Sequence, residues 1–248
     1  MKIRHLLTHS SGLLDYENLM PDTLSHQLSD AEVLLMLEPV NSLDFPPGSA
    51  FRYSNGGYCL LAQIVEKVSG KTFANFLSDN IFKPIGMKNT CVFEQRKRIK
   101  NRAFGYAKDE QEQLVFSDQS LTSATQGDGG VYTSLDDYLK WHRALASNYF
   151  LDLQATLEKV NVPLPGGQGK YGAGWFFAKL PENEVEMFHS GSTCGFSNDV
   201  IRAPGKGVLV VFFSNIADNH VAFAPVFERL KQDGLLQVDY RAWHQATN

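Results

Sequence analysis

The chain has 248 residues, of which 43% are hydrophobic and 20% are charged, and its net charge is −4. These values are typical of an ordinary globular protein with a sizeable core. The weak negative charge gives no electrostatic reason to expect a nucleic acid as a partner. No apolar run approaches the roughly eighteen residues that a membrane span requires. The composition therefore argues against both nucleic-acid binding and a membrane span.

The chain contains three cysteines, Cys59, Cys91 and Cys194. Their number is odd and their spacing matches no zinc or CxxC pattern, so neither a disulfide framework nor a metal site is indicated. A dinucleotide fingerprint and a phosphate-binding loop are also absent from the sequence. We therefore expect neither a metal nor a cofactor.

The first part of the chain carries patterns of helical period. Residues 3–7 predict a short helix, and Asp30 is a candidate N-cap for another. Between residues 60 and 68 the apolar side chains recur at helical spacing, and Gly70 is placed to end that helix. Further helices are expected at 73–81 and 134–145.

From Pro163 onwards the sequence becomes strand-like, with short connections that favour antiparallel neighbours. The candidate strands are 171–180, 184–189, 196–202 and 208–213, and a helix at 222–230 follows them. This order predicts an α+β fold. We expect a mainly helical region at 1–162 and an antiparallel sheet with a closing helix at 163–248, which together form one composite domain.

Two short runs are unusual enough to suggest a functional site. Tyr53-Ser54-Asn55 lies in a loop rich in Pro and Gly just before an apolar helix, an arrangement in which enzymes often hold reactive groups. Turns are rich in Gly, Ser and Asn in any case, so the same run also fits an ordinary surface turn. The second run, 188–196, interrupts a strand pattern with small residues, which suggests a close approach to its backbone.

Two common hydrolase motifs are absent. The chain has neither the Gly-x-Ser-x-Gly nucleophile elbow of α/β-hydrolases nor the His-Glu-x-x-His of zinc peptidases. The sequence therefore argues against both of these classes.

Several motifs occur together in a recognisable order. Pro47-Gly48, then Tyr53-Ser54-Asn55 and the helix behind it resemble the serine β-lactamase-related family, the group of class C β-lactamases, D-alanyl-D-alanine carboxypeptidases and esterases that is similar to penicillin-binding proteins. His189-Ser190-Gly191 stands where this family has Lys-Thr-Gly or His-x-Gly. Further matches lie at 3–13, 81–90, 129–132 and 134–141. The resemblance covers essentially the whole chain.

The resemblance implies a β-lactamase/transpeptidase-like α+β fold and an acyl-transfer mechanism, in which a serine attacks a carbonyl and forms an acyl-enzyme. Tyr53 would shuttle the proton of that serine, with its pKa lowered by nearby cationic groups. Asn55 would bind the substrate through its side-chain amide. The backbone N–H of Ser192 would be one half of the oxyanion hole. Tyr53, Asn55 and Ser192 are thus the catalytic candidates.

The strand motif bears on the substrate. By the same resemblance, His189, Ser190 and Gly191 would bind substrate on the strand that flanks the pocket. A lysine at the first of these positions would offer a permanent positive charge to a substrate carboxylate such as that of a penicillin, whereas a histidine is largely neutral at pH 7. We therefore expect a small-molecule ester, peptide or β-lactam as partner, with ester or D-amino-acid peptide hydrolysis favoured.

The chain departs from the family in one respect, because no lysine is preceded by a serine three residues earlier. In the family, a Ser-x-x-Lys motif lies upstream of the 3–13 match. We therefore expect a family member without its N-terminal segment, lacking the first strands and the nucleophile helix and inactive alone. A non-catalytic homologue or binding module of the same fold is the alternative.

Missing strands would leave an exposed sheet edge and favour self-association. Family members are often exported, although the N-terminus carries no signal-peptide pattern.

Overall fold

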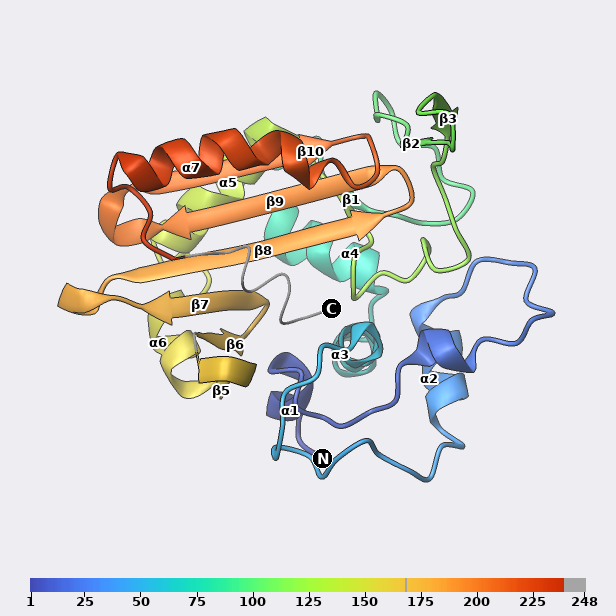
Figure 1. The fold of residues 1–248 in the computed structure, drawn as a ribbon. Helices are drawn as coiled ribbons and strands as arrows, with labels where there is room; N and C mark the ends of the chain where they lie inside the picture. Colours follow the sequence, from blue (N-terminus) through green and yellow to red (C-terminus); the bar gives the residue numbers. More distant parts are fainter. Residues whose placement is uncertain (168, 239–248) are drawn as a thin grey trace. The chain divides into compact units, whose positions relative to one another are not determined.

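A computed structural model describes residues 1–167 and 169–238 of the chain. It divides into two compact units. The first comprises residues 1–100 and 121–162, and the second comprises residues 101–120 together with the chain from Pro163 onwards. The first unit is mainly helical, and the second contains the large sheet (Figure 1).

The helices of the first unit are short, apart from α3 and α5. The unit also contains a two-stranded antiparallel ribbon, in which Cys91 pairs with Tyr132 and Val92 with Val131. Its elements are α1 (Ile3–Leu7), η1 (Tyr16–Leu19), α2 (Asp30–Leu37), α3 (Asn55–Ser69), α4 (Phe73–Leu77), η2 (Ser78–Phe82), β1 (Cys91–Val92), β4 (Val131–Tyr132), α5 (Leu135–Ala146) and α6 (Leu153–Lys159).

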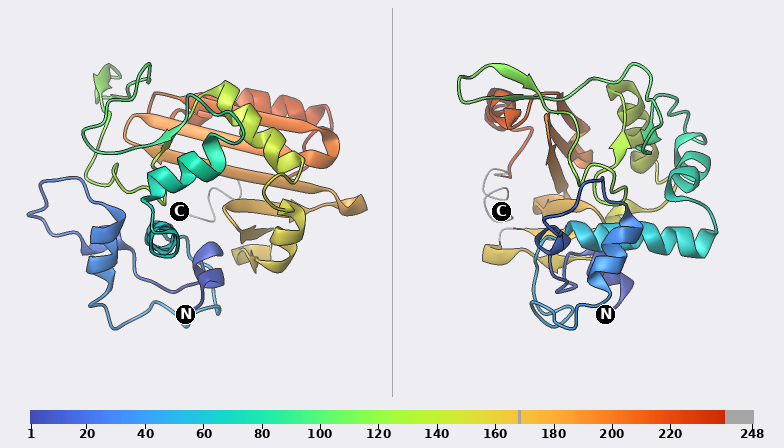
Figure 2. Two further views of the ribbon diagram at one scale, coloured as in Figure 1. Left: turned by 180° about the vertical axis from the view of Figure 1, so that it is seen from behind. Right: turned by 90° about the vertical axis from the view of Figure 1, so that its right-hand side faces the viewer.

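Helix α3 is the central element of the first unit, and both α1 and α2 pack against it (Figure 2). Its start is fixed by Ser54, whose Oγ accepts a hydrogen bond from the N–H of Gly57 at 3.1 Å. It ends at Gly70, which adopts the left-handed conformation that a helix C-terminus requires. Cys59 of α3 is fully buried with Tyr16 and Val33 in the adjoining core.

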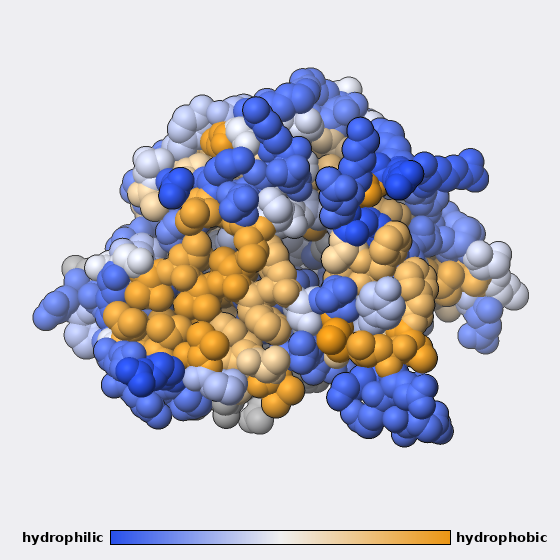
Figure 3. All heavy atoms as spheres, turned by 90° about the horizontal axis from the view of Figure 1, so that it is seen from above, coloured by the Kyte–Doolittle hydropathy of each residue, from blue (hydrophilic) through white to orange (hydrophobic). Residues whose placement is uncertain are grey.

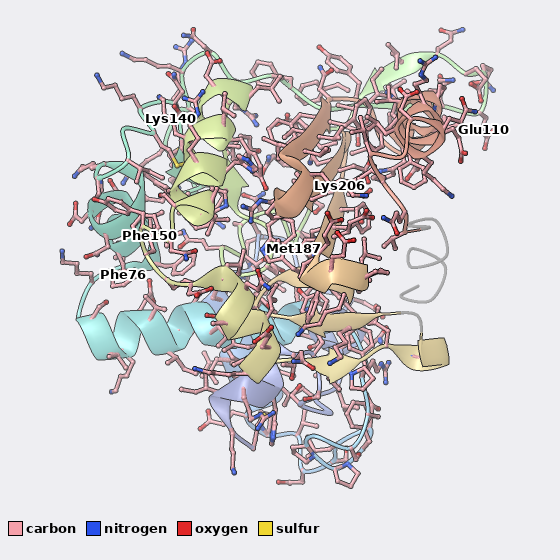
Figure 4. The ribbon with its side chains drawn as sticks, turned by 90° about the vertical axis from the view of Figure 1, so that its left-hand side faces the viewer. Phe76, Glu110, Lys140, Phe150, Met187 and Lys206 are labelled. Atoms are coloured by element: carbon pink, nitrogen blue, oxygen red, sulfur yellow. The ribbon has the colours of Figure 1, made fainter. Side chains whose placement is uncertain are left out.

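Helix α5 is attached to the rest of its unit by a buried carboxylate. Asp137 accepts hydrogen bonds from the N–H of Asn89 at 2.6 Å and the hydroxyl of Thr90 at 3.0 Å. Its other oxygen accepts a hydrogen bond from Nζ of Lys140, which also donates to the carbonyl of Gly86 at 2.8 Å. Lys140 is labelled on α5 in Figure 4. These contacts join α5 to the turn that follows the π-helical turn at 78–82.

The second unit is built on a six-stranded sheet of order β10-β9-β8-β7-β6-β5, and the pairings from β6 to β10 are antiparallel. Its elements are β2 (Tyr106–Lys108), β3 (Leu114–Phe116), β5 (Val162–Pro163), η3 (Pro165–Gly167), β6 (Lys170–Gly172), β7 (Trp175–Lys179), η4 (Pro181–Asn183), β8 (Val185–Thr193), β9 (Phe196–Ala203), η5 (Pro204–Lys206), β10 (Val208–Ser214), η6 (Asn219–Phe223) and α7 (Ala224–Gln232). Helices in one part and an antiparallel sheet with a closing helix in the other confirm the predicted α+β class.

One predicted strand is divided in the structure. The run expected at 171–180 forms β6 and β7, because Ala173 and Gly174 both adopt positive φ values, 47° and 84°, and reverse the chain between them. The next strand, expected at 184–189, continues to Thr193 as β8. The second unusual run of the sequence therefore lies within β8 and the hairpin that follows it.

A close backbone approach fixes the tip of the β8–β9 hairpin, as the small residues of this run predicted. A Cβ placed on Gly195 would lie 2.0 Å from the backbone nitrogen of Tyr106, so only glycine fits here. Tyr106 also forms a parallel bridge with Ile216. The hairpin tip is thus held between β2 and the segment that follows β10.

Strand β10 lies at one edge of the sheet, with β9 as its neighbour. Helix α7 and η6 lie over one face, where Phe223 stacks on Phe212 of β10 with a centroid separation of 5.6 Å (Figure 1).

Hydrophobic side chains gather in patches on the face seen from above in Figure 3. Among residues 1–167 and 169–238, no helix combines the length and apolarity needed to cross a bilayer.

Candidate active site

The Tyr53-Ser54-Asn55 run is held by backbone hydrogen bonds to the polar turn near the N-terminus. The N–H of Arg52 donates to the carbonyl of His9, and the N–H of Gly48 donates to the carbonyl of Ser10, both at 2.8 Å. The loop before α3 therefore runs alongside the turn at residues 8–12. The two segments, 8–12 and 48–55, together form one rigid entrance to the helix. These bonds hold the Tyr53-Ser54-Asn55 run in one backbone geometry.

His9 is the residue that fixes this entrance. It is fully buried and adopts a left-handed backbone conformation with φ of 50°. Its Nδ1 accepts a hydrogen bond from the N–H of Ser54 at 3.1 Å. Its ring centroid lies 4.0 Å from that of Tyr53 and 4.9 Å from that of Tyr58. Since Nδ1 is an acceptor, the neutral ring carries its proton on Nε2.

The structure reverses the expected direction of the pKa shift for Tyr53. Burial of the phenol raises its pKa above the ordinary value, and the charges of Tyr58 and Asp128 act in the same direction. None of these causes is cationic, so the expectation of a pKa lowered by nearby positive groups is wrong for this chain. The phenol of Tyr53 is therefore neutral at physiological pH and keeps a hydroxyl proton with which it can donate a hydrogen bond.

Asn55 is the first residue of α3, and its side-chain amide is partly exposed. Nδ2 donates to Oε1 of Glu17 in η1 at 3.3 Å. The amide is thus oriented by a carboxylate 38 residues away in sequence, a partner that the motif alone does not indicate. The carbonyl oxygen of the same side chain is the end suited to accept a hydrogen bond from the N–H of a bound ligand.

A cluster of acidic groups lies behind this entrance. The ligand atoms of Asp30, Cys59 and Asp128 lie within 4.8 Å of one another, which is a spacing a metal ion could use. Asp128 accepts hydrogen bonds from the hydroxyls of Thr125 at 3.1 Å and Tyr16 at 3.4 Å. Burial raises the pKa of Asp128 to about 6 and also raises the pKa of Asp30. The two carboxyl groups are thus neighbours whose ionised forms are disfavoured by burial.

The strand motif lies in β8 of the second unit. His189 is partly buried, and its Nδ1 donates to the carbonyl of Ser190 at 2.7 Å, because a carbonyl can only accept. Its Nε2 then accepts from the hydroxyl of Tyr171 at 3.3 Å when the ring is neutral. Ser190 is partly buried, whereas Gly191 and the residue after it are exposed. His189, Ser190 and Gly191 thus form one continuous segment with a fixed imidazole tautomer.

Ser192 has side-chain partners that the sequence did not indicate. Its Oγ lies 2.8 Å from Nε2 of His220, and Nδ1 of His220 lies 2.6 Å from Oδ2 of Asp199. His220 comes from η6 and Asp199 from β9. Tyr53 and Asn55 belong to the first unit, and the β8 residues belong to the second.

The sequence matches the Beta-lactamase family over residues 1–233. The chain belongs to this family. Family membership confirms the resemblance carried by the ordered motifs.

Two relatives show how far the similarity extends. Penicillin-binding protein 4* of Bacillus subtilis (strain 168) is 34% identical over 231 residues, which are 86% of this chain and 51% of that protein. A D-aminopeptidase of Gluconobacter oxydans (strain 621H) is 26% identical over 230 residues, which are 90% of this chain and 43% of that protein. The chain thus spans about half the length of the curated relatives it matches.

Solved structures confirm the fold. A penicillin-binding protein from Bacillus halodurans superimposes with a TM-score of 0.80 at 27% identity, over 93% of this chain and 72% of that one. An octameric penicillin-binding protein homologue from Pyrococcus abyssi gives a TM-score of 0.72 at 25% identity, over 87% of this chain and 52% of that one. The predicted β-lactamase/transpeptidase-like fold is therefore correct.

Proposed function

We propose that this chain provides the tyrosine, amide and strand components of an acyl-transfer site in a serine hydrolase of the esterase or D-amino-acid peptidase type. The main support is the rigid entrance to α3, where His9 holds the Tyr53-Ser54-Asn55 run in place. A phenol next to a buried imidazole and an amide at the first turn of a helix are groups that can donate a proton and bind a substrate. The family of the chain agrees with this chemistry.

In this proposal Tyr53 delivers a proton to the leaving group from a phenol that is protonated at physiological pH. Asn55 binds the substrate through the carbonyl of its side chain, while Glu17 orients the amide nitrogen. The backbone N–H of Ser192 stabilises the oxyanion, and His189, Ser190 and Gly191 flank the substrate. The nucleophile is a Ser-x-x-Lys serine that this sequence does not contain, so the chain alone is inactive at this site.

The substrate class follows from His189. A histidine at this position, unlike a lysine, offers no permanent positive charge to a substrate carboxylate. A small ester or a D-amino-acid peptide therefore suits the site better than a β-lactam. The name of the D-aminopeptidase relative agrees with this preference.

The competing proposal is a non-catalytic homologue or binding module of the same fold. The coding sequence upstream of Met1 distinguishes the two. An in-frame Ser-x-x-Lys motif favours the hydrolase, and its absence favours the binding module. A version of the protein that carries the motif should then hydrolyse short-chain p-nitrophenyl esters and D-amino-acid amides faster than nitrocefin. Faster nitrocefin turnover would overturn the proposed substrate class.

We further propose that the chain self-associates through the sheet edge formed by β10. An edge strand presents unpaired backbone N–H and C=O groups to any strand that can align with it. All seven residues of β10 are partly exposed, and six of them are apolar. One similar protein is described as octameric, which agrees with assembly in this fold.

A further inference from the structure

We propose that Ser192, His220 and Asp199 form a second nucleophilic centre, in which the side chain of Ser192 reacts with esters and other acylating or phosphonylating electrophiles. This centre is independent of the proposed site at Tyr53 and needs no Ser-x-x-Lys motif. It uses Oγ of Ser192, whereas the acyl-transfer site above uses only the backbone N–H of that residue.

The hydrogen bonds run in one direction through the three side chains. The carboxylate of Asp199 can only accept, so Nδ1 of His220 donates to Oδ2 across 2.6 Å. In the neutral ring Nε2 is then the acceptor, and the hydroxyl of Ser192 donates to it across 2.8 Å. A serine hydroxyl on a histidine whose far nitrogen donates to a carboxylate is the arrangement that activates serine nucleophiles on unrelated folds.

The sheet places two of the three residues on one face. In the register of β8 and β9, Ser192 pairs with Ser197 and Ser190 pairs with Asp199. Cross-strand partners share a face, and so do residues two apart on one strand. Ser192 and Asp199 therefore point to the same side of the sheet, and they lie diagonally across the ladder.

The segment that carries His220 is anchored to this face by Ser197. Its Oγ donates to the carbonyl of Ile216 at 2.9 Å and accepts from the N–H of Asn219 at 3.0 Å. Asn219 also donates through Nδ2 to Oγ of Ser214 at 3.0 Å. The backbone on the N-terminal side of His220 is thus tied to β10 and, through Ser197, to the β9 residue that pairs with Ser192.

Burial decreases from the carboxylate to the hydroxyl. Asp199 is 3% exposed, the side chain of His220 is 28% exposed, and Ser192 is exposed at the end of β8. A buried carboxylate can fix the orientation of the ring and stabilise the imidazolium that forms during attack. An exposed hydroxyl remains accessible to a small electrophile from solvent. This gradient is what a reactive serine requires.

The end of β8 also offers backbone donors. β7 pairs with β8 only as far as Phe188, so the segment 189–193 extends beyond that ladder. Alternate residues of an antiparallel strand direct their N–H groups to opposite sides, so some N–H groups of this segment point to the side that β7 does not occupy. Such donors are suited to stabilise the negative oxygen of a tetrahedral intermediate.

The reaction on an ester has two balanced steps. Oγ of Ser192 forms a bond to the carbonyl carbon while its proton moves to Nε2 of His220, and the imidazolium then gives that proton to the departing alcohol. Water next attacks the acyl-serine, loses a proton to the same nitrogen, and releases the carboxylic acid as Oγ regains the proton. With an alkyl fluorophosphonate the O–P bond forms, the P–F bond breaks, and fluoride leaves.

The test is intact-mass measurement of the whole chain after incubation with an alkyl fluorophosphonate, followed by peptide mapping. We expect one phosphonyl adduct per chain, located on Ser192. Ser192→Ala should abolish the adduct, and Thr193→Ala, which removes the neighbouring exposed hydroxyl, should not change the labelling rate. His220→Ala should slow labelling by about a hundredfold or more, and added imidazole should restore part of the rate.

Asp199 is a positioning residue. Its variant distinguishes a loss of the orientation of the His220 ring from a general structural defect. Asp199→Asn should lower the first-order rate constant of labelling at saturating probe and leave the half-saturating concentration unchanged. A general structural defect would instead alter the half-saturating concentration and the unfolding midpoint. An unlabelled chain, an adduct on another residue, or equal labelling of wild type and Ser192→Ala would overturn the proposal. None of these results depends on Tyr53, so the acyl-transfer site is tested separately.

Discussion

The backbone N–H of Ser54 donates to Nδ1 of His9 at 3.1 Å, and this bond joins residues 45 positions apart in the sequence. Ser54 caps α3 with its hydroxyl while its backbone is tied to a buried ring. The same ring packs against Tyr53. A single histidine therefore sets both the start of the helix and the position of the phenol in front of it.

Replacing His9 should destabilise the protein strongly. His9→Ala removes a buried ring that contacts Tyr53 and Tyr58 and leaves the N–H of Ser54 without this acceptor. We expect a loss of about 2–4 kcal/mol in the free energy of unfolding, measured by urea denaturation. The matched control is His26→Ala, because His26 is exposed and should contribute less than about 1 kcal/mol. Equal losses in the two variants would contradict the role of His9.

Two glycines of similar backbone conformation should respond differently to substitution. Gly12 and Gly70 have φ values of 73° and 69°, so alanine is strained at both. A Cβ at Gly12 would lie 2.1 Å from the carbonyl oxygen of Phe45, whereas nothing lies within 4 Å of a Cβ at Gly70.

We therefore expect Gly70→Ala to cost about 1–2 kcal/mol of unfolding free energy and Gly12→Ala to cost clearly more, with a displaced 44–54 loop. Thermal unfolding of both variants measures the difference. If the two variants lose the same stability, the close approach at Gly12 is not a constraint.

The buried carboxyl of Asp128 should make stability depend on pH. Burial raises its pKa to about 6, so between about pH 4 and 6 the folded protein holds a proton that the unfolded chain has already released. Stability therefore falls as the pH rises through this window and levels off above it. Burial also raises the pKa of Asp30, so this group likewise makes the stability fall as the pH rises.

Asp128→Asn imitates the neutral carboxyl and keeps an acceptor for Thr125 and Tyr16. Between pH 4 and pH 7 the free energy of unfolding of the variant should rise relative to that of wild type by on the order of 1–3 kcal/mol, measured by chemical denaturation. Asp22→Asn, at an exposed position, serves as the control and should show no such change. A difference between wild type and Asp128→Asn that does not vary with pH would show that Asp128 is ionised throughout.

The edge formed by β10 should determine self-association. A lysine at Val211, in the middle of this edge strand, should disfavour the alignment of a second strand by charge and desolvation. Light scattering over a concentration series should show larger species for wild type and a shift to monomer for Val211→Lys. Val68→Lys changes an apolar residue that is 82% exposed on α3 and should leave the distribution unchanged. A monomeric wild type at every concentration would contradict this proposal.

Local signals in the sequence predicted much of the fold. The helix expected at 134–145, the end of α3 at Gly70 and the strand expected at 208–213 each depend on neighbouring residues, and each lies where its pattern indicated. The division of β6 from β7 was missed, because the chain reverses through Ala173 at positive φ, which is not predictable from an alanine. Helix and strand periodicity carries no information about such a turn.

The site was only partly predictable for the same reason. Tyr53 and Asn55 form one motif and could be recognised together. Their supporting partners, His9 and Glu17, lie 45 and 38 residues away along the chain from the groups they contact. No periodic pattern connects such pairs, so only the folded chain brings them together. The same holds for the second unit, where Ser192 and His220 are 28 residues apart in the sequence and His220 and Asp199 are 21 apart. No sequence pattern links these residues either.

The phenol of Tyr53 is the group on which the proposed acyl-transfer site depends most directly. The decisive measurement is the turnover of a D-amino-acid amide or a short-chain ester by a version of the protein that carries a Ser-x-x-Lys segment upstream of Met1. Tyr53→Phe keeps the ring against His9 and removes only the hydroxyl. We expect kcat to fall by about 10²–10⁴-fold with little change in KM, because the lost group acts on the proton in the transition state. Equal kcat values for the two proteins would contradict the proposed role of Tyr53.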